Sequence, residues 1–136
     1  KYIEDMEKSQ IIIKKKGDRF FGYVANRENT DFLFYKKLFN LLKIKESGLI
    51  KHITEHLYPK VIILYGSYLR GEDKKESDID IFIESKKKKE LNLEKFENVL
   101  KRNIHLILES SLKKLNNNLH SEIINGLVLY GYIKNE

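Results

Sequence analysis

Two aspartates inside one short apolar segment are the residues of this sequence best placed to do chemistry. Asp78 and Asp80 lie two positions apart: Asp78 stands just before the apolar run 79–83, and Asp80 lies within it. On a strand, alternate side chains share a face, so both carboxylates project to the same side a few Å apart. Two anions held so close repel each other unless a cation lies between them, and oxygen ligands favour Mg²⁺ or Mn²⁺. The pair therefore predicts a divalent metal site.

A Gly-Ser pair upstream adds groups that can bind phosphate. Gly66 lets the backbone pass close to a ligand, and Ser67 offers a hydroxyl and a backbone N–H at the start of a short helix expected over 68–70. Arg70 lies one turn from Ser67, and it either reaches the same phosphate or is an ordinary exposed helix arginine. A phosphate cradle beside a metal site is what transfer of a phosphate-bearing group needs.

The elements that must position these groups alternate between strand and helix. The continuous apolar run 61–65 is typical of a strand covered on both faces. Strands are also expected at 79–83, 104–108 and 127–130, and helices at 90–101, from about 110, and near 121–125. This alternation indicates an α/β unit. The side chains expected to face inward from the helix at 90–101 are Leu91, Leu93, Phe96, Val99 and Leu100.

The first part of the chain predicts a hairpin with a charged tip. Two β-favouring runs, 11–13 and 20–24, flank a basic turn that contains Gly-Asp. The spacing of apolar residues over 2–8 fits the last turns of a helix. The basic residues of the turn, which are candidates for contact with the DNA backbone, are Lys14, Lys15, Lys16 and Arg19.

Two helices are expected between this hairpin and the first buried strand. The first has Asn29 as its N-cap and extends to about Lys45. The second covers 47–57 and stops at Tyr58, because the residue before a proline is pushed out of the helical region. The apolar stripe at helical spacing that predicts the first helix consists of Phe32, Tyr35, Leu38, Phe39 and Leu42.

Composition narrows the function classes. The chain has 136 residues, 41% of them hydrophobic, with 15 Phe and Tyr residues to fill one core. It contains no cysteine, which excludes disulfides, thiolate nucleophiles and Cys-ligated zinc. No apolar run approaches the roughly 18 residues of a membrane span, so we expect a cytoplasmic protein without membrane contact. Residue 1 is Lys rather than Met, and we expect further chain upstream.

The net charge of +6 belongs mainly to the first part of the chain. Residues 1–60 carry 13 basic and 8 acidic side chains, whereas residues 61–136 carry 13 and 12. A basic region attracts the phosphate backbone of nucleic acid without regard to sequence, although a solvated Lys-rich surface gives the same count. The excess positive charge therefore indicates possible contact between the hairpin and DNA, and it says little about the Asp78 and Asp80 pair.

The motif resembles the nucleotidyltransferase superfamily that includes DNA polymerase beta, and in particular its minimal members. These are marked by Gly-Ser, ten residues and then Asp-x-Asp, and residues 68–77 supply the ten. The resemblance implies an α/β (α+β) nucleotidyltransferase fold, a small mixed sheet flanked by helices, over 61–136. Residues 29–60 are then a helical linker, and residues 1–28 resemble the helix end and wing of a winged-helix DNA-binding module.

The resemblance also implies roles. By this resemblance, Gly66 and Ser67 would bind the triphosphate of ATP or another nucleoside triphosphate, and Asp78 and Asp80 would hold Mg²⁺. A nucleotidyl group, AMP in the case of ATP, then moves to an acceptor hydroxyl while pyrophosphate leaves. Minimal members often modify a helical (HEPN-type) toxin protein, so a protein hydroxyl is the acceptor class implied. The oligomeric state stays open, and a homodimer is among the alternatives.

One position departs from the family pattern. A third carboxylate is expected on the strand at 104–108, and His105 stands there instead. A neutral imidazole can act as a base but is a poor ligand for a hard ion. Glu109, four residues further on, is the alternative acid, although a surface position suits it better. His105 therefore favours a rival interpretation, in which a catalytically impaired nucleotide-binding domain serves a winged-helix regulator.

Weaker signals favour ordinary structural roles. The sequence His52-Ile-Thr-Glu-His56 matches the spelling of one zinc-peptidase class but lacks a third ligand, and we interpret it as chance. The lysine run 86–89 is expected to be a solvated loop. Asp73 and Glu76 are expected to face solvent. The two tyrosines of the last strand and its end, Tyr130 and Tyr132, are expected to be packing residues.

Overall fold

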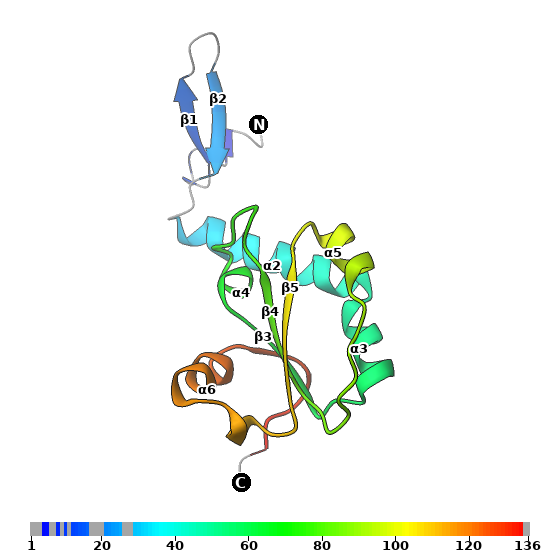
Figure 1. Cartoon of the computed structure of the whole chain (residues 1–136). Helices are drawn as coiled ribbons and strands as arrows, with labels where there is room; N and C mark the ends of the chain where they lie inside the picture. The colour runs from blue at the N-terminus through cyan, green and yellow to red at the C-terminus, as the bar shows by residue number, and fades with distance from the viewer. Residues whose placement is uncertain are drawn as a thin grey trace.

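The computed structural model describes residues 4, 5, 8, 10, 12–16, 21–25 and 29–134 of the chain. For residues 12–16 and 21–25 it describes the backbone alone. Figure 1 shows a hairpin at the N-terminal end and an α/β body that contains the remaining elements. Among the described helices, none combines the length and the apolar character that crossing a membrane requires.

The body is built on a mixed sheet of four strands in the order β5-β4-β3-β6. Strand β3 (Val61–Tyr65) pairs antiparallel with both β4 (Ile79–Glu84) and β6 (Leu127–Gly131), and β4 pairs parallel with β5 (Ile104–Glu109). The parallel pair needs a crossover connection, which α5 (Glu94–Leu100) supplies. The expected α/β fold with a small mixed sheet is confirmed.

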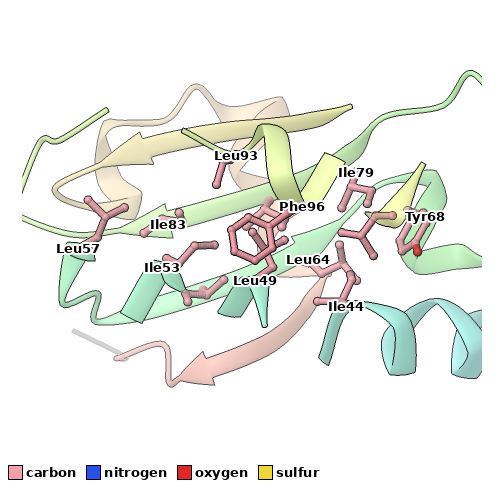
Figure 2. Close-up of a cluster of buried hydrophobic side chains, with 13 residues drawn as sticks. Ile44, Leu49, Ile53, Leu57, Leu64, Tyr68, Ile79, Ile83, Leu93 and Phe96 are labelled. Atoms are coloured by element: carbon pink, nitrogen blue, oxygen red, sulfur yellow. The ribbon is translucent and has the colours of Figure 1, made fainter. Parts of the chain in front are cut away.

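Each face of the sheet carries its own apolar cluster. The larger cluster joins Ile79, Ile81 and Ile83 of β4 to residues of the helices on that side. Figure 2 shows Leu49, Ile53 and Leu57 of α3, Ile44 of α2 and Phe96 of α5 packed together over this face. The smaller cluster, on the other face, joins Phe82 of β4 and Tyr65 of β3 to Ile123 of α6 (Asn117–Ile124). Strand β3 is buried from end to end, as its apolar sequence predicts.

The two predicted linker helices are present. Helix α2 (Thr30–Ser47) starts at Asn29, whose side chain accepts a hydrogen bond of 3.0 Å from the N–H of Phe32. Helix α3 (Leu49–Leu57) ends at Tyr58, which takes a left-handed conformation (φ 43°, ψ 56°) before Pro59. The chain therefore leaves the helix where the proline predicts, and the next residues enter β3.

Helix α2 presents its apolar stripe to solvent. An apolar stripe is the usual signature of a buried face. Here the buried residues are Asn40 and Ile44, on the opposite side of the helix. The exposed members of the stripe have between 49% and 59% of their surface accessible; together with their neighbour Phe34 they are Tyr35, Leu38, Phe39 and Leu42.

Some expectations for the second half are wrong. Helix α5 begins at Glu94 rather than residue 90, and Val99 is 56% exposed instead of facing inward. The helix expected from about Ser110 is only a 3₁₀ turn, η1 (Leu112–Lys114), and α6 begins at Asn117, earlier than expected. Tyr130 and Tyr132 are 44% and 67% exposed, so they are not packing residues. Tyr130 belongs to β6, which lies at the edge of the sheet, and Tyr132 follows the end of that strand.

The N-terminal region contains the predicted hairpin with shifted bounds. Strands β1 (Ile12–Lys16) and β2 (Phe21–Ala25) pair antiparallel, with Lys16 opposite Phe21. Lys14, Lys15 and Lys16 therefore lie in a strand and not in the turn, because pairing with β2 extends β1 through them. Arg19 and the rest of the turn lie outside the described residues, as do Ile11 and Phe20. Glu4, Asp5 and Lys8 have helical backbone, in line with the expected helix end.

Candidate functional site

The Gly-Ser turn follows directly on the buried strand β3. Gly66 has φ 81° and ψ −166°, a conformation that in practice only glycine adopts. It precedes the short helix α4 (Ser67–Arg70), as predicted. A Cβ added to Gly66 would overlap the Asp80 carboxylate, with Oδ2 as the nearest atom. The turn and the carboxylate are therefore in direct contact, and no side chain separates them.

Asp80 lies in the middle of the sheet, between two strands in register. Its neighbour on β3 is Tyr65, and its neighbour on β5 is His105. Because side chains alternate along β4, Asp80 shares the face of Phe82, which is the face covered by α6. The carboxylate keeps 26% of its side-chain surface exposed. It is thus held on a rigid strand but stays open to a ligand.

Asp78 stands just before β4, and it is exposed. The backbone is fixed at the next residue, because the N–H of Ile79 donates a hydrogen bond of 2.8 Å to the carbonyl of Asn103. By strand alternation Asp78 projects to the same side as Asp80. The Gly-Ser turn and Asp80 therefore meet at the end of β3 and the beginning of β4, with Asp78 two residues before Asp80 in the chain.

His105 faces this site. Its Nδ1 lies 3.1 Å from Oδ1 of Asp80, and 56% of the imidazole is exposed. A carboxylate oxygen can only accept a hydrogen bond, so the geometry selects a ring with the proton on Nδ1. Glu109, the alternative acid, pairs with Glu84 at the other end of the strands, about 13 Å from His105 at the usual rise per residue. It is therefore remote from Asp80.

Two further residues border the site and are not marked by the motif. Tyr65 is buried beside Asp80, and burial together with the charges of Asp80 and Glu122 raises its pKa to about 12. Sequence reasoning could have identified Tyr65, because side chains alternate along the predicted strand over 61–65 and each residue therefore has a definite face of the sheet. Glu122 comes from α6, and only the tertiary structure brings it near.

Arg70 makes a surface ion pair. Its Nε donates a hydrogen bond of 2.6 Å to Oε1 of Glu72, and both side chains are about half exposed. Such a pair contributes little to stability in water. The structure therefore agrees with an exposed helix arginine, and a role in phosphate binding remains a prediction for Arg70.

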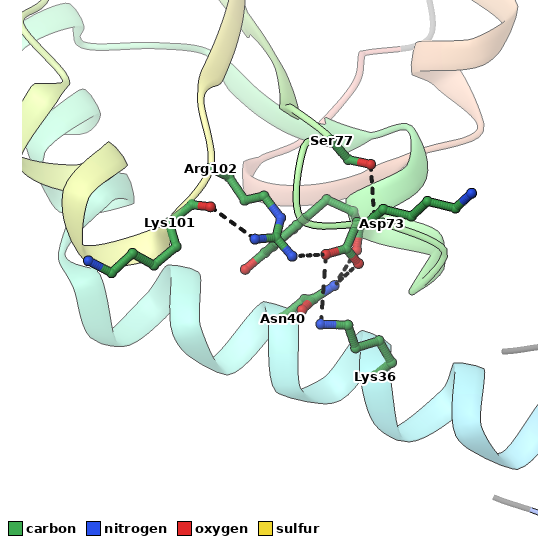
Figure 3. A network of polar contacts seen from close by, with 8 residues as sticks. Lys36, Asn40, Asp73, Ser77, Lys101 and Arg102 are labelled. Carbon is green, nitrogen blue, oxygen red and sulfur yellow. Dashed lines mark hydrogen bonds and ion pairs between the residues drawn. The ribbon is translucent and has the colours of Figure 1, made fainter. Parts of the chain in front are cut away.

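Asp73, expected to face solvent, is fully buried. Figure 3 shows it at the centre of a network that joins α2 to the loops around it. Its Oδ1 accepts a hydrogen bond of 2.8 Å from Asn40, and its Oδ2 accepts one of 3.0 Å from Arg102 and lies 3.7 Å from Nζ of Lys36. The prediction fails because these partners lie far away in sequence. Glu76, by contrast, is exposed as expected.

This network holds together the segments that carry the site. Asn40 also donates a hydrogen bond of 2.9 Å to the carbonyl of Tyr68 in α4. Gly71, at the end of α4, packs so closely on α2 that a Cβ there would meet the carbonyl oxygen of Leu33 at 2.7 Å. Arg102 lies just before β5, which carries His105. Helix α2 therefore fixes the Gly-Ser turn, the loop before Asp78 and the entry to β5 relative to one another.

The two histidines of the zinc-like sequence form no metal site in the described part of the chain. Their ring centroids are 4.2 Å apart, and the His52 ring packs on Phe96 with centroids 5.0 Å apart. Burial lowers the pKa of His52 below its ordinary value, with a smaller contribution from His56. The lysine run 86–89 lies in an exposed loop, as expected. These signals do not form a second site.

The Asp78 and Asp80 pair suits a magnesium ion that arrives with a nucleotide. No cluster of three or more His, Cys, Asp or Glu side chains that could hold a metal occurs within the described residues. Mg²⁺ is commonly held by one or two carboxylates plus the phosphates of a substrate. The carboxylates of Asp78 and Asp80, the second of them against the Gly-Ser turn, fit this mode, in which the substrate would supply the remaining ligands.

Comparison with known families gives the same assignment. The sequence matches the family described as Nucleotidyltransferase domain over residues 46–130, which spans α3, strands β3 to β5, all but the last residue of β6, and the site. Comparisons with curated proteins and with solved structures give no match. Domains of this family transfer nucleotidyl groups and generally use a nucleoside triphosphate and a divalent metal. The chain, with its Gly-Ser turn against an Asp-x-Asp strand in a small mixed sheet, belongs to the nucleotidyltransferase domain family.

Proposed function

We propose that this chain transfers a nucleotidyl group from a nucleoside triphosphate to an acceptor hydroxyl with the help of Mg²⁺. ATP is the substrate to test first, with AMP as the group transferred. The observation that carries the proposal is the direct contact between Gly66 and the Asp80 carboxylate. It brings a phosphate-binding turn and a metal-binding carboxylate to one point.

The residues of the site divide the work. The Gly66 and Ser67 backbone and the Ser67 hydroxyl bind the phosphates, since the first N–H groups of α4 have no partner within the helix. Asp78 and Asp80 hold the ion together with the phosphates. When bound, the ion stabilises the negative charge that develops on the transferred group and on the departing pyrophosphate. The rigid β3 and β4 strands keep these groups in place without rearrangement.

His105 is suited to accept the proton of the acceptor hydroxyl. Its Nδ1–H donates to Asp80 Oδ1, which leaves Nε2 as the basic nitrogen of the neutral ring. The same arrangement, a carboxylate that fixes the tautomer of a histidine base, is used in hydrolase triads. The proton thus moves from the acceptor hydroxyl to Nε2 as the new bond to phosphorus forms and the bond to pyrophosphate breaks.

The acceptor class we propose is a hydroxyl on a partner protein of helical architecture. The resemblance to minimal members of the superfamily supports this choice.

The test is a transfer assay with ATP labelled at the α-phosphate. The purified chain is incubated with Mg²⁺ and either a helical partner protein or small hydroxyl acceptors, beside the Asp78→Asn/Asp80→Asn variant. We expect label in an acceptor with the wild-type chain and none with the variant. Equal labelling by both proteins would overturn the assignment of the site.

A second candidate function follows from His105. Because a carboxylate is expected at this position, the domain is alternatively a nucleotide sensor attached to a DNA-binding module that uses Lys14, Lys15, Lys16 and Arg19. The variant His105→Asp separates the two functions. If His105 is the base, the variant transfers the nucleotidyl group more slowly than the wild type. If the domain is an impaired enzyme, the variant gains transfer, and the wild type shows only salt-sensitive DNA binding.

A further inference from the structure

Helix α2 carries an apolar seam on its solvent side that the fold does not use. Phe34, Tyr35, Leu38, Phe39 and Leu42 form the seam, and each is about half exposed or more. Single exposed apolar residues are normal on a protein surface, but a contiguous group of this size marks an interaction surface. The seam is therefore a candidate interaction surface.

The seam cannot be buried by a small rotation of the helix. The opposite face of α2 is anchored by the buried Asn40, which bonds to Tyr68 and Asp73, and by Ile44 in the larger apolar cluster. Turning the helix would break these buried hydrogen bonds, and unpaired buried polar groups are costly. The two faces of α2 thus have separate partners, one inside the domain and one outside it.

The ends of the seam carry opposite charges. Asp31 and Lys45 are each seven residues from Leu38, so the three residues lie on nearly the same line along the helix. Both charged residues are exposed. The distance along the axis between them is about 21 Å, with Leu38 at its midpoint. Along the line through Leu38 the seam is therefore apolar in the middle, with Asp31 at its N-terminal end and Lys45 at its C-terminal end, and the exposed Glu46 lies about 100° further round the helix from Lys45.

This pattern is complementary to itself in one orientation. If a second α2 lies antiparallel across Leu38, Asp31 of each copy meets Lys45 of the other, and Phe34 meets Leu42. Both ion pairs form at once, because a two-fold axis repeats every contact. The helix dipoles then also oppose each other. In a parallel arrangement Asp31 would face Asp31 and Lys45 would face Lys45, and like charges in contact are unfavourable.

We propose that the chain forms a two-fold dimer through antiparallel pairing of α2, with Leu38 on the axis. The interface does not involve the site, because α2 packs on one face of the sheet whereas Asp80 and His105 lie on the face covered by α6. A single helix pair is a small interface, so the dimer is expected to be weak. Monomer and dimer should then coexist at the protein concentrations used in biophysical measurements.

The first experiment measures the mass of the full 136-residue chain by sedimentation velocity over a wide concentration range. We expect the mass to rise from 16.2 kDa to twice that value with concentration. Leu38→Asp places two carboxylates on the axis and raises the dissociation constant at least about tenfold. Val99→Asp, at an exposed apolar position on α5, is the matched control and leaves the dimer unchanged.

Charge exchange then tests the orientation. Asp31→Lys and Lys45→Asp each weaken the dimer, because each creates two like-charge contacts. The double exchange restores it, since every contact is again between opposite charges. All variants change exposed residues, and an unchanged thermal melting curve of the monomer verifies their fold. A wild-type chain that stays monomeric at all concentrations overturns the proposal, as does a dimer that Leu38→Asp does not affect. A dimer that ignores the charge exchanges overturns the antiparallel arrangement.

Discussion

Asp73 and Asp80 lie seven residues apart in one segment, and the fold treats them in opposite ways. Asp73 has no exposed side-chain surface and is surrounded by Asn40, Arg102 and Lys36. Asp80 is 26% exposed, and within the described residues its side-chain hydrogen-bond partner is His105. Protein cations neutralise the first carboxylate permanently, whereas the second is free to bind a cation that arrives with a substrate.

The difference separates a structural from a functional acid. A buried carboxylate with fixed ion pairs contributes to the stability of the domain, because removing it leaves its cationic partners uncompensated. A carboxylate held open on a rigid strand costs the free protein little when it is removed, and its value lies in what it binds.

The largest effect is expected on activity from Asp80→Asn. The amide keeps the shape of the side chain but loses the charge that holds the metal, so nucleotidyl transfer falls at least about a hundredfold. The free energy of unfolding changes by less than about 0.5 kcal/mol, as for other partly exposed positions. Transfer of label and urea denaturation measure the two quantities on the same preparation. A variant that unfolds easily would contradict the functional role given to Asp80.

Asp73→Ala should have its main effect on stability. The substitution leaves the partly buried Arg102 and Lys36 without their carboxylate and removes a bond from Asn40, so the free energy of unfolding falls by about 3 kcal/mol. Urea denaturation measures the change. The control is Glu76→Ala, in the same loop but exposed, which changes stability by less than about 0.5 kcal/mol. Equal losses of stability from Asp73→Ala and Glu76→Ala would contradict the structural role given to Asp73.

Gly66→Ala should lower both the free energy of unfolding and the affinity for metal and nucleotide. The methyl group overlaps the Asp80 carboxylate, and the backbone conformation of Gly66 is unfavourable for alanine by about 1–3 kcal/mol. We expect lower stability and a displaced Asp80, hence weaker binding of the metal and nucleotide. Gly48→Ala is the control, because Gly48 also has φ 81° but has no atom within 4 Å of an added Cβ. It lowers stability without an effect on nucleotide binding.

Two tyrosines report the charges of the two carboxylates. Burial and Asp80 raise the pKa of Tyr65 to about 12, and burial and Asp73 raise that of Tyr68 to about 12. Asp80→Asn should lower the pKa of Tyr65 alone, and Asp73→Asn that of Tyr68 alone, as followed by NMR of ring-labelled tyrosine. Both tyrosines are neutral in the stable fold, so stability is complete below about pH 10 and falls between about pH 10 and 12. If Asp80→Asn changed the pKa of Tyr68, or Asp73→Asn that of Tyr65, the positions given to the two carboxylates would be contradicted.

The sequence was most informative where structure is local. The apolar run 61–65, the Gly-Ser pair and the alternation around Asp80 each depend on neighbouring residues, so the buried strand, the turn and the shared face follow directly from them. The parallel register of β4 and β5, which sets His105 beside Asp80, agrees with the family pattern for the third acidic position. These features suffice to locate the candidate site.

Features that depend on distant partners were not predictable. Asp73 is buried because Asn40 lies 33 positions before it and Arg102 lies 29 positions after it, and nothing near Asp73 in sequence indicates either contact. Helix α2 has apolar residues on both sides, so the sequence predicts the helix but not which side is covered. Asn40 decides this, since its hydrogen bonds to Tyr68 and Asp73 can form only inside the domain.

The affinity for ATP with and without Mg²⁺, measured by titration calorimetry in three proteins, tests whether the open carboxylates bind the metal and the nucleotide. These are the wild-type chain, Asp78→Asn/Asp80→Asn, and Asp73→Asn at a temperature where it is folded. We predict Mg²⁺-dependent binding to the wild type and to Asp73→Asn, and none to the double variant. Unchanged affinity in the double variant with Mg²⁺ would contradict the assignment of the open carboxylates as the metal and nucleotide site.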